Sequence, residues 1–368
     1  MAETRDMLAV FGEIGKQFRL TGGVYAYSSI KNGNINSTYK VTYRQPDGSM
    51  KAYIFQKINT FVFNKPMEIM ENIDRVTTHI RSKNQNRISL HFHHTADGKN
   101  YVFDEDGSFW RVMNCIDSIT FDTCDDLSVI CSTGEAFGAF QMQLADFDGS
   151  TLHETIADFH NTRKRLDTLF AHAAEDPCGR CAEAKEEIDY IASVREKACE
   201  LCDRYYAGEF PVRVTHNDTK SNNVLFDRET KQPLVVIDLD TVMPGMAMYD
   251  FGDAVRFIAN TAAEDEPDLS RVFFDTAKFR AFAKGFIGEV KGSLTQAELD
   301  SMTLGAFSIT VELASRFLDD YLTGDKYFKV NYPGHNLVRT RCQLRLAKDI
   351  LRKFDELQWI VKDVWEQK

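Results

Sequence analysis

Polar side chains gather in the stretch VTHNDTKSNNVLFD, residues 214–227, whose centre is flanked by apolar residues. Within it, His216, Asp218 and Asn223 have the spacing H-x-D-x-x-x-x-N. The carboxylate of Asp218 could accept a hydrogen bond from an attacking hydroxyl group and aim that group at a phosphate. Lys220 could approach the transferred phosphoryl group as a point charge. The pattern predicts phosphoryl transfer, with Asp218 and Lys220 as catalytic residues.

A second acid follows on an apolar run. The residues LVVI lead to Asp238, which lies fifteen positions after Asn223, and Asp240 comes next but one. Amide and carboxylate oxygens are the hard ligands that magnesium prefers, so we expect Asn223 and Asp238 to hold Mg²⁺. We expect His216 to maintain the shape of the loop. Any one of these residues, taken alone, is as easily a turn cap. Their joint spacing is that of a kinase catalytic loop and favours a phosphotransferase.

The chain also contains a literal D-F-G triplet at residues 250–252. In protein kinases this triplet holds the metal ion. Because Asp238 already occupies the corresponding position at a strand end, we expect Asp250 to be structural. It should cap the helix that follows and brace the catalytic loop.

Short strand-like runs with turn signals dominate the first 115 residues. Asn32-Gly33 and Pro46-Asp-Gly48 mark turns between such runs, and two more candidate strands flank Asp97-Gly98. We expect helices over residues 1–20 and after Pro66.

The rest of the chain is predicted to be mainly helical from about residue 133, with one β hairpin inside residues 211–242. The expected fold is therefore α+β and bilobal. A small β-rich lobe, residues 1–115, would cover the nucleotide. A larger, mainly helical lobe, residues 116–368, would carry the catalytic loop, and the site would lie between the lobes.

Composition narrows the class of partner. The formal net charge of -11 disfavours nucleic acid, because an acidic surface repels phosphate backbones. The sequence shows no apolar run of about 18 residues that could span a membrane, and its first residues are interrupted by charges. We expect a cytoplasmic monomer.

The eight cysteines include two C-x-x-C pairs, Cys178/Cys181 and Cys199/Cys202, whose separation would suit a zinc ribbon. Residues 182–206 contain no Gly or Pro and read as one helix. A rise of about 1.5 Å per residue would place the two pairs roughly 27 Å apart, too far to share an ion. Reduced thiols on helices are the expected alternative.

The motifs HNDTKSNN, VVIDLDTVMPG and YDFGD resemble those of the aminoglycoside phosphotransferase and choline kinase family, which has a protein-kinase-like fold. The segments RFLDDYLTGDKYF and YPGHNLVRTR are similar to those of N-acetylhexosamine 1-kinases within that family. The resemblance covers most of the chain. It implies ATP- and Mg²⁺-dependent phosphorylation of the anomeric (C1) hydroxyl of N-acetylhexosamines such as GlcNAc and GalNAc.

The resemblance also implies residue roles. Asp218 would be the catalytic base, Asn223 and Asp238 would hold magnesium, and Arg316 and Tyr327 would contact the sugar. Taken without the resemblance, Arg316 would be read as part of a packing layer and Tyr327 as a core aromatic residue.

Two departures from the family pattern concern the N-terminal lobe. Asn34 stands where the sugar kinases carry a histidine that touches the sugar, so it would contact the sugar without being able to carry charge. The strand that corresponds to the kinase lysine strand reads YIFQKIN, and we expect Gln56 to face the nucleotide. A one-residue shift would instead turn Lys57 inward.

We expect the adenine edge of ATP to bind backbone groups near Met113, Cys115 and Ile116. Two other functions remain open. One is a related kinase that phosphorylates another sugar, choline or an aminoglycoside. The other is an inactive nucleotide-binding scaffold, which the absent strand lysine would support.

Overall fold

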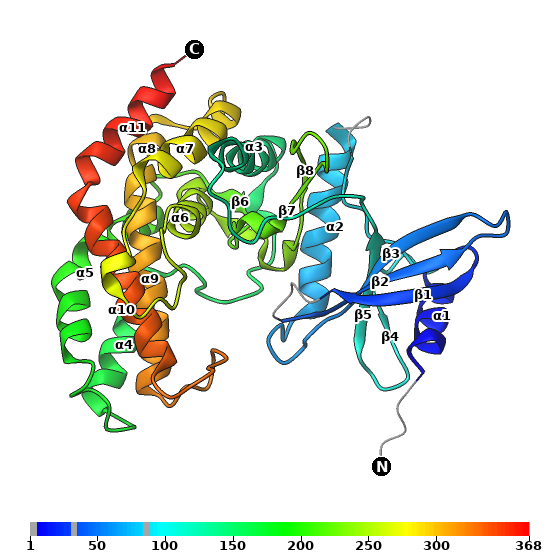
Figure 1. The fold of residues 1–368 in the computed structure, drawn as a ribbon, viewed down its shortest axis with the longest axis horizontal. Coiled ribbons are helices and arrows are strands. Elements are labelled where there is room, and N and C mark those ends of the chain that lie inside the picture. Colours follow the sequence, from blue (N-terminus) through cyan, green and yellow to red (C-terminus); the bar gives the residue numbers. More distant parts are fainter. Residues whose placement is uncertain (1–5, 31–34, 84–87, 368) are drawn as a thin grey trace. The chain divides into compact units, whose positions relative to one another are not determined.

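The computed structural model describes residues 6–30, 35–83 and 88–367. Contacts divide the chain into two compact units. The first, here the β-rich unit, is the chain up to Ile119 together with residues 153–156 and 237–242; the second, here the helical unit, is all the rest. Figure 1 shows an antiparallel sheet in the first and helices dominating the second. The fold is α+β, as the sequence predicts.

The β-rich unit is built on a five-stranded antiparallel sheet with the order β1-β2-β3-β5-β4. Its elements are α1 (Met7–Gln17), β1 (Gly23–Ile30), β2 (Ser37–Arg44), β3 (Met50–Lys57), α2 (Pro66–Lys83), β4 (Val102–Phe103) and β5 (Phe109–Asn114). Gly48 turns the chain between β2 and β3 with a φ of 84°, which a residue with a side chain rarely adopts. The predicted turn at Asn32-Gly33 and the predicted site residue Asn34 lie outside the described residues.

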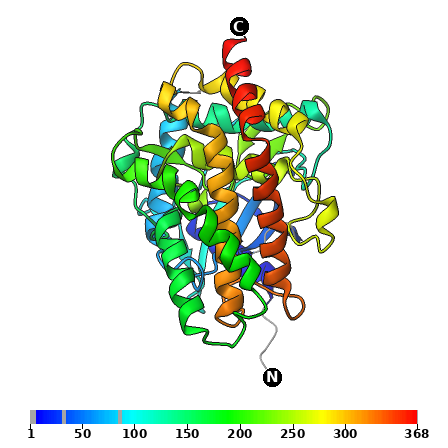
Figure 2. The same ribbon diagram turned by 90° about the vertical axis from the view of Figure 1, so that its left-hand side faces the viewer.

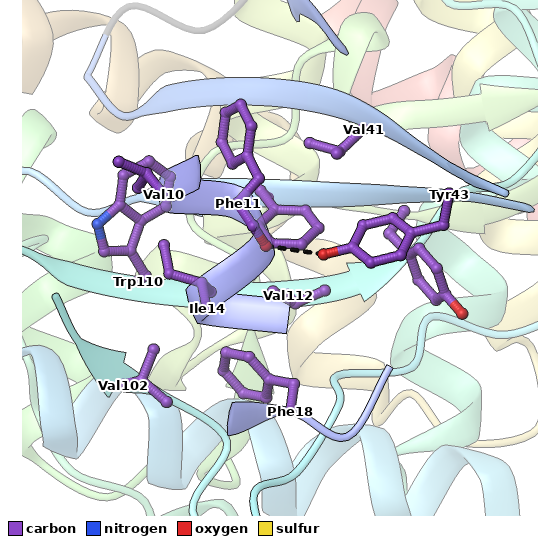
Figure 3. Packing of buried hydrophobic residues seen from close by; sticks show 11 residues of the cluster. Val10, Phe11, Ile14, Phe18, Val41, Tyr43, Val102, Trp110 and Val112 are labelled. Atoms are coloured by element: carbon purple, nitrogen blue, oxygen red, sulfur yellow. Dashed lines mark hydrogen bonds between the residues drawn. The ribbon is translucent and has the colours of Figure 1, made fainter. Parts of the chain in front are cut away.

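Helix α1 covers one face of this sheet (Figure 3). Asp6 caps the helix by accepting a hydrogen bond from the N–H of Leu8. Phe11 packs edge-on against Phe55 and Trp110, and its carbonyl accepts a hydrogen bond of 2.7 Å from the Tyr43 hydroxyl. Alternate residues of β2, β3 and β5 thus form the core on this face, and the residues between them point to the opposite face.

The helical unit contains nine helices among the residues that the structure describes. These are α3 (Leu127–Gln143), α4 (Thr162–Glu175), α5 (Lys185–Tyr206), α6 (Ala247–Ile258), α7 (Thr276–Val290), α8 (Gln296–Asp300), α9 (Met302–Leu322), α10 (His335–Arg352) and α11 (Phe354–Glu366). Helix α9, orange in Figure 2, packs against α4, α5, α6 and α10. It is buried along almost its whole length.

Glycines let several of these helices touch backbone to backbone. A side chain on Gly252 of α6 would come within 2.5 Å of the Gly305 carbonyl oxygen of α9. A side chain on Gly134 of α3 would come within 2.3 Å of the Phe282 carbonyl oxygen of α7. Where helices approach this closely, no residue larger than glycine fits without moving one of them.

Several helices and strands differ in extent from those that the sequence predicts. The candidate strand at residues 89–96 pairs with β5 through one isolated bridge, Phe92 to Met113, because the side chain of Asn114 bonds the backbone of Ser89 and His91. Near its C-terminal end the chain forms two helices, α10 and α11, and α4 was not predicted as a separate helix. The hairpin within residues 211–242 is present as β7 (Val224–Phe226) and β8 (Pro233–Val236).

The cysteine pairs lie in different settings. Cys178 is exposed in a turn before α5, whereas Cys199 and Cys202 are buried within that continuous helix. The part of the chain that the structure describes contains no group of three or more metal-binding side chains arranged around one point. None of its helices is long and apolar enough to cross a membrane.

Candidate active site

The polar stretch forms a loop between two short strands of the helical unit. β6 (Arg213–Thr215) pairs with β9 (Met243–Gly245), and the loop then passes through a single 3₁₀ turn, Ser221–Asn223, into β7. Thr215 ties the start of the loop by donating a hydrogen bond to the Met243 carbonyl at 3.0 Å. The loop is therefore held at both ends by strand pairing.

Asp218 receives hydrogen bonds on both carboxylate oxygens. The Lys220 ammonium group lies 2.8 Å from Oδ1, and the Asn223 amide donates to Oδ2 at 3.1 Å and to the Asp218 carbonyl at 2.8 Å. The side chain of Asp218 is only partly buried. Two donors thus orient a carboxylate that solvent and ligands can still reach. The structure brings Asp218, Lys220 and Asn223 together as predicted.

Lys220 stays charged in this position. Burial alone would lower its pKa, but the nearby charges of Asp218, Asp253 and Glu264 and the hydrogen bond to Asp218 outweigh that effect and raise it. A charged ammonium group next to Asp218 can stabilise negative charge that develops during phosphoryl transfer.

Asp250 braces the loop from below, out of contact with solvent. Its carboxylate accepts hydrogen bonds from the backbone N–H groups of His216 at 2.9 Å and Asn217 at 2.8 Å, and from the Gln141 amide at 2.6 Å. Its carbonyl accepts a further bond of 2.7 Å from the Thr219 hydroxyl. Burial raises the pKa of Asp250, while His216 and the hydrogen bonds act in the opposite direction. The brace lets Asn217 hold a left-handed φ of 65°.

A second buried acid supports the same loop. Asp253 accepts a hydrogen bond of 2.9 Å from the Thr219 N–H and pairs with Arg256 at 2.8 Å. Burial tends to raise the pKa of Asp253, but Arg256 and Lys220 outweigh it and lower that pKa. Both acids therefore act through the backbone of the loop, one turn apart on α6.

The D-F-G triplet is structural throughout. Asp250 braces the loop as predicted, but the predicted helix cap is wrong, because α6 already begins at Ala247 and Asp250 lies in its first turn. Phe251 packs among Phe279, Phe282 and Phe286 with ring centroids 5.5–5.7 Å away. Gly252 provides the close approach to α9.

His216 shapes the loop, as expected. Its buried ring lies edge-on to Phe137 and Phe140 of α3, with centroids 5.6 and 5.8 Å away. Its Nδ1 atom accepts a hydrogen bond of 3.3 Å from the Asp218 N–H. The imidazole therefore links the α3 core to the backbone of Asp218.

The predicted magnesium ligands have suitable chemistry. The NH₂ group of Asn223 is engaged with Asp218, so the amide oxygen is the atom left for a cation. Asp238 comes two residues after β8 and has a left-handed φ of 60°. Val224 pairs with Val236, so Asn223 directly precedes the paired end of the β7–β8 hairpin. An amide and a carboxylate oxygen fit Mg²⁺.

In the β-rich unit, Gln56 rather than Lys57 is turned away from solvent. Gln56 is half-buried and Lys57 is exposed. The Gln56 amide donates to the Thr38 hydroxyl at 3.0 Å and its oxygen accepts from Nε of Arg111 at 2.9 Å. These contacts lie on the face opposite α1, which Gln56 shares with Arg111 and Met113.

The other two predicted nucleotide-binding residues, Met113 and Cys115, lie at the end of β5. Met113 is buried on β5, and Cys115 follows the end of that strand half-buried. Burial raises the pKa of the Cys115 thiol, so this group stays protonated at neutral pH.

Two of the predicted sugar residues, Arg316 and Tyr327, lie close together. The Arg316 guanidinium group on α9 lies 5.9 Å from the Tyr327 ring centroid, 5.2 Å from Phe159 and 5.7 Å from Phe328. Such distances are typical of cation–π contacts. Tyr327 is 64% exposed, so the predicted alternative of a core aromatic residue is wrong. Backbone hydrogen bonds from Tyr327 and Phe328 to Asp320 hold this edge in place.

The sequence did not predict four residues that contact the candidate site. Gln141 and Asp253 support the loop. Arg165 lies near Arg316, and burial together with the charge of Arg316 lowers the pKa of Arg165. Arg111 contacts Gln56. Arg111 was detectable, because a lone arginine in the apolar run FWRVM needs a buried partner.

Residues 26–282 match the family described as "Phosphotransferase enzyme family". The chain belongs to this family. Its fold is also found in solved phosphotransferases. An aminoglycoside phosphotransferase from Alicyclobacillus acidocaldarius matches 99% of this chain and 98% of its own with a TM-score of 0.62 at 11% identity. A microcompartment-associated aminopropanol kinase matches 90% of this chain and 94% of its own with a TM-score of 0.59 at 15% identity.

A spectinomycin phosphotransferase, solved in complex with ADP and spectinomycin, matches 97% of this chain and 97% of its own with a TM-score of 0.51 at 11% identity. At such identities these likenesses establish the protein-kinase-like fold of the phosphotransferase. The chain is thus a phosphotransferase of this family, and its substrate is a separate question.

Proposed function

We propose that this phosphotransferase transfers the γ-phosphoryl group of ATP to the C1 hydroxyl of an N-acetylhexosamine, with Mg²⁺. The observation that carries the transfer chemistry is Asp218, a carboxylate aimed by Lys220 and Asn223 and still partly exposed. The sugar is supported by the resemblance of the segments around Arg316 and Tyr327 to N-acetylhexosamine 1-kinases. The nucleotide is supported by the ADP bound to the similar spectinomycin phosphotransferase.

Asp218 would act on the acceptor. Its carboxylate would accept a hydrogen bond from the C1 hydroxyl, orient that oxygen for in-line attack, and take the proton as the new P–O bond forms. The bond between the γ-phosphorus and its bridging oxygen breaks, and the electron pair leaves with ADP. Positioning supplies much of the rate in such a reaction.

Lys220 and the metal ligands would manage charge. Lys220 would keep Asp218 oriented and place its positive charge near the transferred group. Asn223 and Asp238 would supply oxygen ligands for Mg²⁺. The ion held by these two residues would supply positive charge that offsets the negative charge of the phosphates.

The remaining predicted residues would bind the two substrates. Arg316 and Tyr327 would present a guanidinium group and an exposed aromatic face to the sugar, and sugar rings pack well on such faces. Gln56, Met113 and Cys115 would contact the nucleotide from the sheet. Asn34 would also contact the sugar.

A second candidate acceptor is a small amino alcohol, because one solved protein of similar fold is an aminopropanol kinase. The two candidates make different demands. An amino alcohol is a cation and needs acidic or aromatic partners, whereas Arg316 is itself a cation. The guanidinium group therefore favours a neutral sugar.

The test is ATP consumption with Mg²⁺ against GlcNAc, GalNAc, galactose, glucosamine, mannose, choline and aminopropanol, followed by phosphorus NMR of the product. We expect turnover on GlcNAc or GalNAc and an anomeric phosphate. Turnover on another compound alone would replace the substrate while keeping the chemistry of Asp218. Lack of ATP turnover with every acceptor, despite ADP binding, would favour the inactive scaffold.

A further inference from the structure

Arg111 is a buried cation in the sheet of the β-rich unit. Its side chain is 1% exposed, and it stands opposite Gln56 in the register of β3 and β5. Nε donates to Gln56, and the terminal nitrogen Nη1 forms an ion pair with Oδ1 of Asp240. A charge removed from water in this way has to be compensated by its partners, and Asp240 is the partner that carries the opposite charge.

Asp240 is engaged on both carboxylate oxygens. Arg111 binds Oδ1, and the Asn36 amide donates to Oδ2 at 2.7 Å. The same Asn36 accepts a hydrogen bond of 3.0 Å from the Asn59 N–H, so it is held in turn by the chain after β3. Asp240 is 3% exposed. Although it lies only two residues from the predicted metal ligand Asp238, its oxygens are committed to the sheet, which makes it an anchor.

The same six-residue segment, residues 237–242, is anchored at its other end by α2. The Asn72 amide donates to the Val242 carbonyl at 3.0 Å and to the His153 carbonyl at 2.8 Å, while its oxygen accepts from the His153 N–H at 2.9 Å. Asn72 is 1% exposed. Side chains of the sheet and of α2 therefore hold the segment that contains Asp238.

In protein kinases, the third strand carries a lysine that pairs with a glutamate of the following helix. Here the third strand carries Gln56, and the residue opposite it on the neighbouring strand β5 is the buried cation Arg111. We propose that Arg111 is a positioning residue for phosphoryl transfer: by holding Asp240, it holds Asp238 in the left-handed conformation from which it binds the metal. This inference rests on the proposed function.

If the ion pair between Arg111 and Asp240 were purely structural, its replacement would affect stability but not metal binding. Neutral residues of similar shape can replace a buried ion pair with little loss of stability, whereas removal of one partner leaves an uncompensated charge. Stability alone therefore cannot distinguish the two roles. Metal binding can, because neutral replacements would restore packing without restoring the grip on Asp240.

The experiment measures Mn²⁺ as a probe of the Mg²⁺ site, by electron paramagnetic resonance with ADP and without any acceptor. The variants are Arg111→Lys, Arg111→Met, Asp240→Asn and the double variant Arg111→Met/Asp240→Asn. ADP binding without metal and thermal unfolding are measured in parallel. Lys353→Met is the control, because it breaks a different, partly buried ion pair, with Asp349 of α10.

We expect Arg111→Lys and the double variant to bind Mn²⁺·ADP about 10- to 100-fold more weakly than the wild type, the loss typical of residues that orient metal ligands. Metal-free ADP binding and the control should be close to wild type. If Arg111→Met fails to fold, Arg111→Lys and the double variant decide the outcome. Wild-type Mn²⁺·ADP affinity in either would overturn the inference. A wild-type protein that binds no metal nucleotide would instead overturn the proposed function.

Discussion

The carboxylate of Asp250 holds the backbone N–H of His216 at 2.9 Å and so connects α6 directly to the catalytic loop. Its replacement should therefore damage folding as well as catalysis. In Asp250→Ala, the N–H groups of His216 and Asn217 and the amide of Gln141 lose their acceptor. Unsatisfied buried donors cost about 1–3 kcal/mol each, so we expect a loss of about 3 kcal/mol or more in the free energy of unfolding.

Urea denaturation measures this loss. Asp250→Asn keeps one acceptor oxygen and should lose less. A change below about 1 kcal/mol in Asp250→Ala would contradict the bracing role, because it would mean that the loop finds other acceptors.

Asp218→Asn should separate catalysis from binding. An amide cannot take the proton of the acceptor, so kcat should fall by a factor of about 10²–10⁴. ADP affinity and thermal stability should change little, because the Asp218 carboxylate is partly exposed and its bonds to Lys220 and Asn223 stay within one loop. Asp227→Asn, a half-buried acid that caps the turn after β7, is the matched control and should keep wild-type turnover. Near-normal kcat in Asp218→Asn would remove this residue from the mechanism.

Two glycines of one helix should respond in opposite ways to alanine. A methyl group on Gly285 of α7 would overlap the backbone of Cys131 in α3, whereas none of the described atoms lies within 4 Å of one on Gly288, one turn later. Overpacking costs about 1–3 kcal/mol or more, so Gly285→Ala should lower the melting temperature. Gly288→Ala should raise stability by about 0.5–1 kcal/mol, because alanine favours the helix. Equal effects would contradict the close contact.

The histidines beside β3 should make stability depend on pH. Burial, together with the charges of His91 and Lys51, lowers the pKa of His93 to about 4, so between about pH 6.5 and 4 the unfolded chain binds a proton that the folded chain does not. The stability that neutral His93 contributes is therefore fully present above about pH 6.5. It is lost as the pH falls, at up to about 1.4 kcal/mol per pH unit.

Urea denaturation between pH 4 and 7 tests this. His93→Phe retains a ring beside Tyr53 but cannot titrate, so its stability should fall less steeply than that of the wild type. The two curves running parallel would show that other groups cause the slope.

The contacts of Asp218 with Lys220 and Asn223 could be predicted because the sequence information for them is local. His216, Asp218 and Asn223 lie within eight consecutive positions, and their spacing alone indicates the chemistry. The brace by Asp250 was also foreseen. Its supposed cap was wrong because α6 begins at Ala247 without any side-chain cap, so no residue type marks the start of that helix.

The contacts around Arg111 could not be predicted because they join distant parts of the chain. Arg111 and Asp240 are 129 residues apart, and Asn36 and Asp240 are 204 apart. Only the register of β3 with β5 brings Gln56 opposite Arg111. A sequence shows that a lone arginine in an apolar strand needs a partner, but the fold determines which acid that is.

The division of the chain by contacts has a consequence for how this protein can be cut or recombined. Residues 237–242 cluster with the sheet although they follow β8 of the helical unit. A fragment that ends at residue 119 would leave Arg111, Asn36 and Asn72 facing vacant positions, and the complementary fragment would inherit Asp238 without the side chains that hold its segment. A chimaera of two family members joined at residue 119 would take its sheet from one parent and residues 237–242 from the other. The compact unit that contains the sheet is therefore discontinuous in sequence, and Asn36, Arg111 and Asp240 should be exchanged together in such chimaeras.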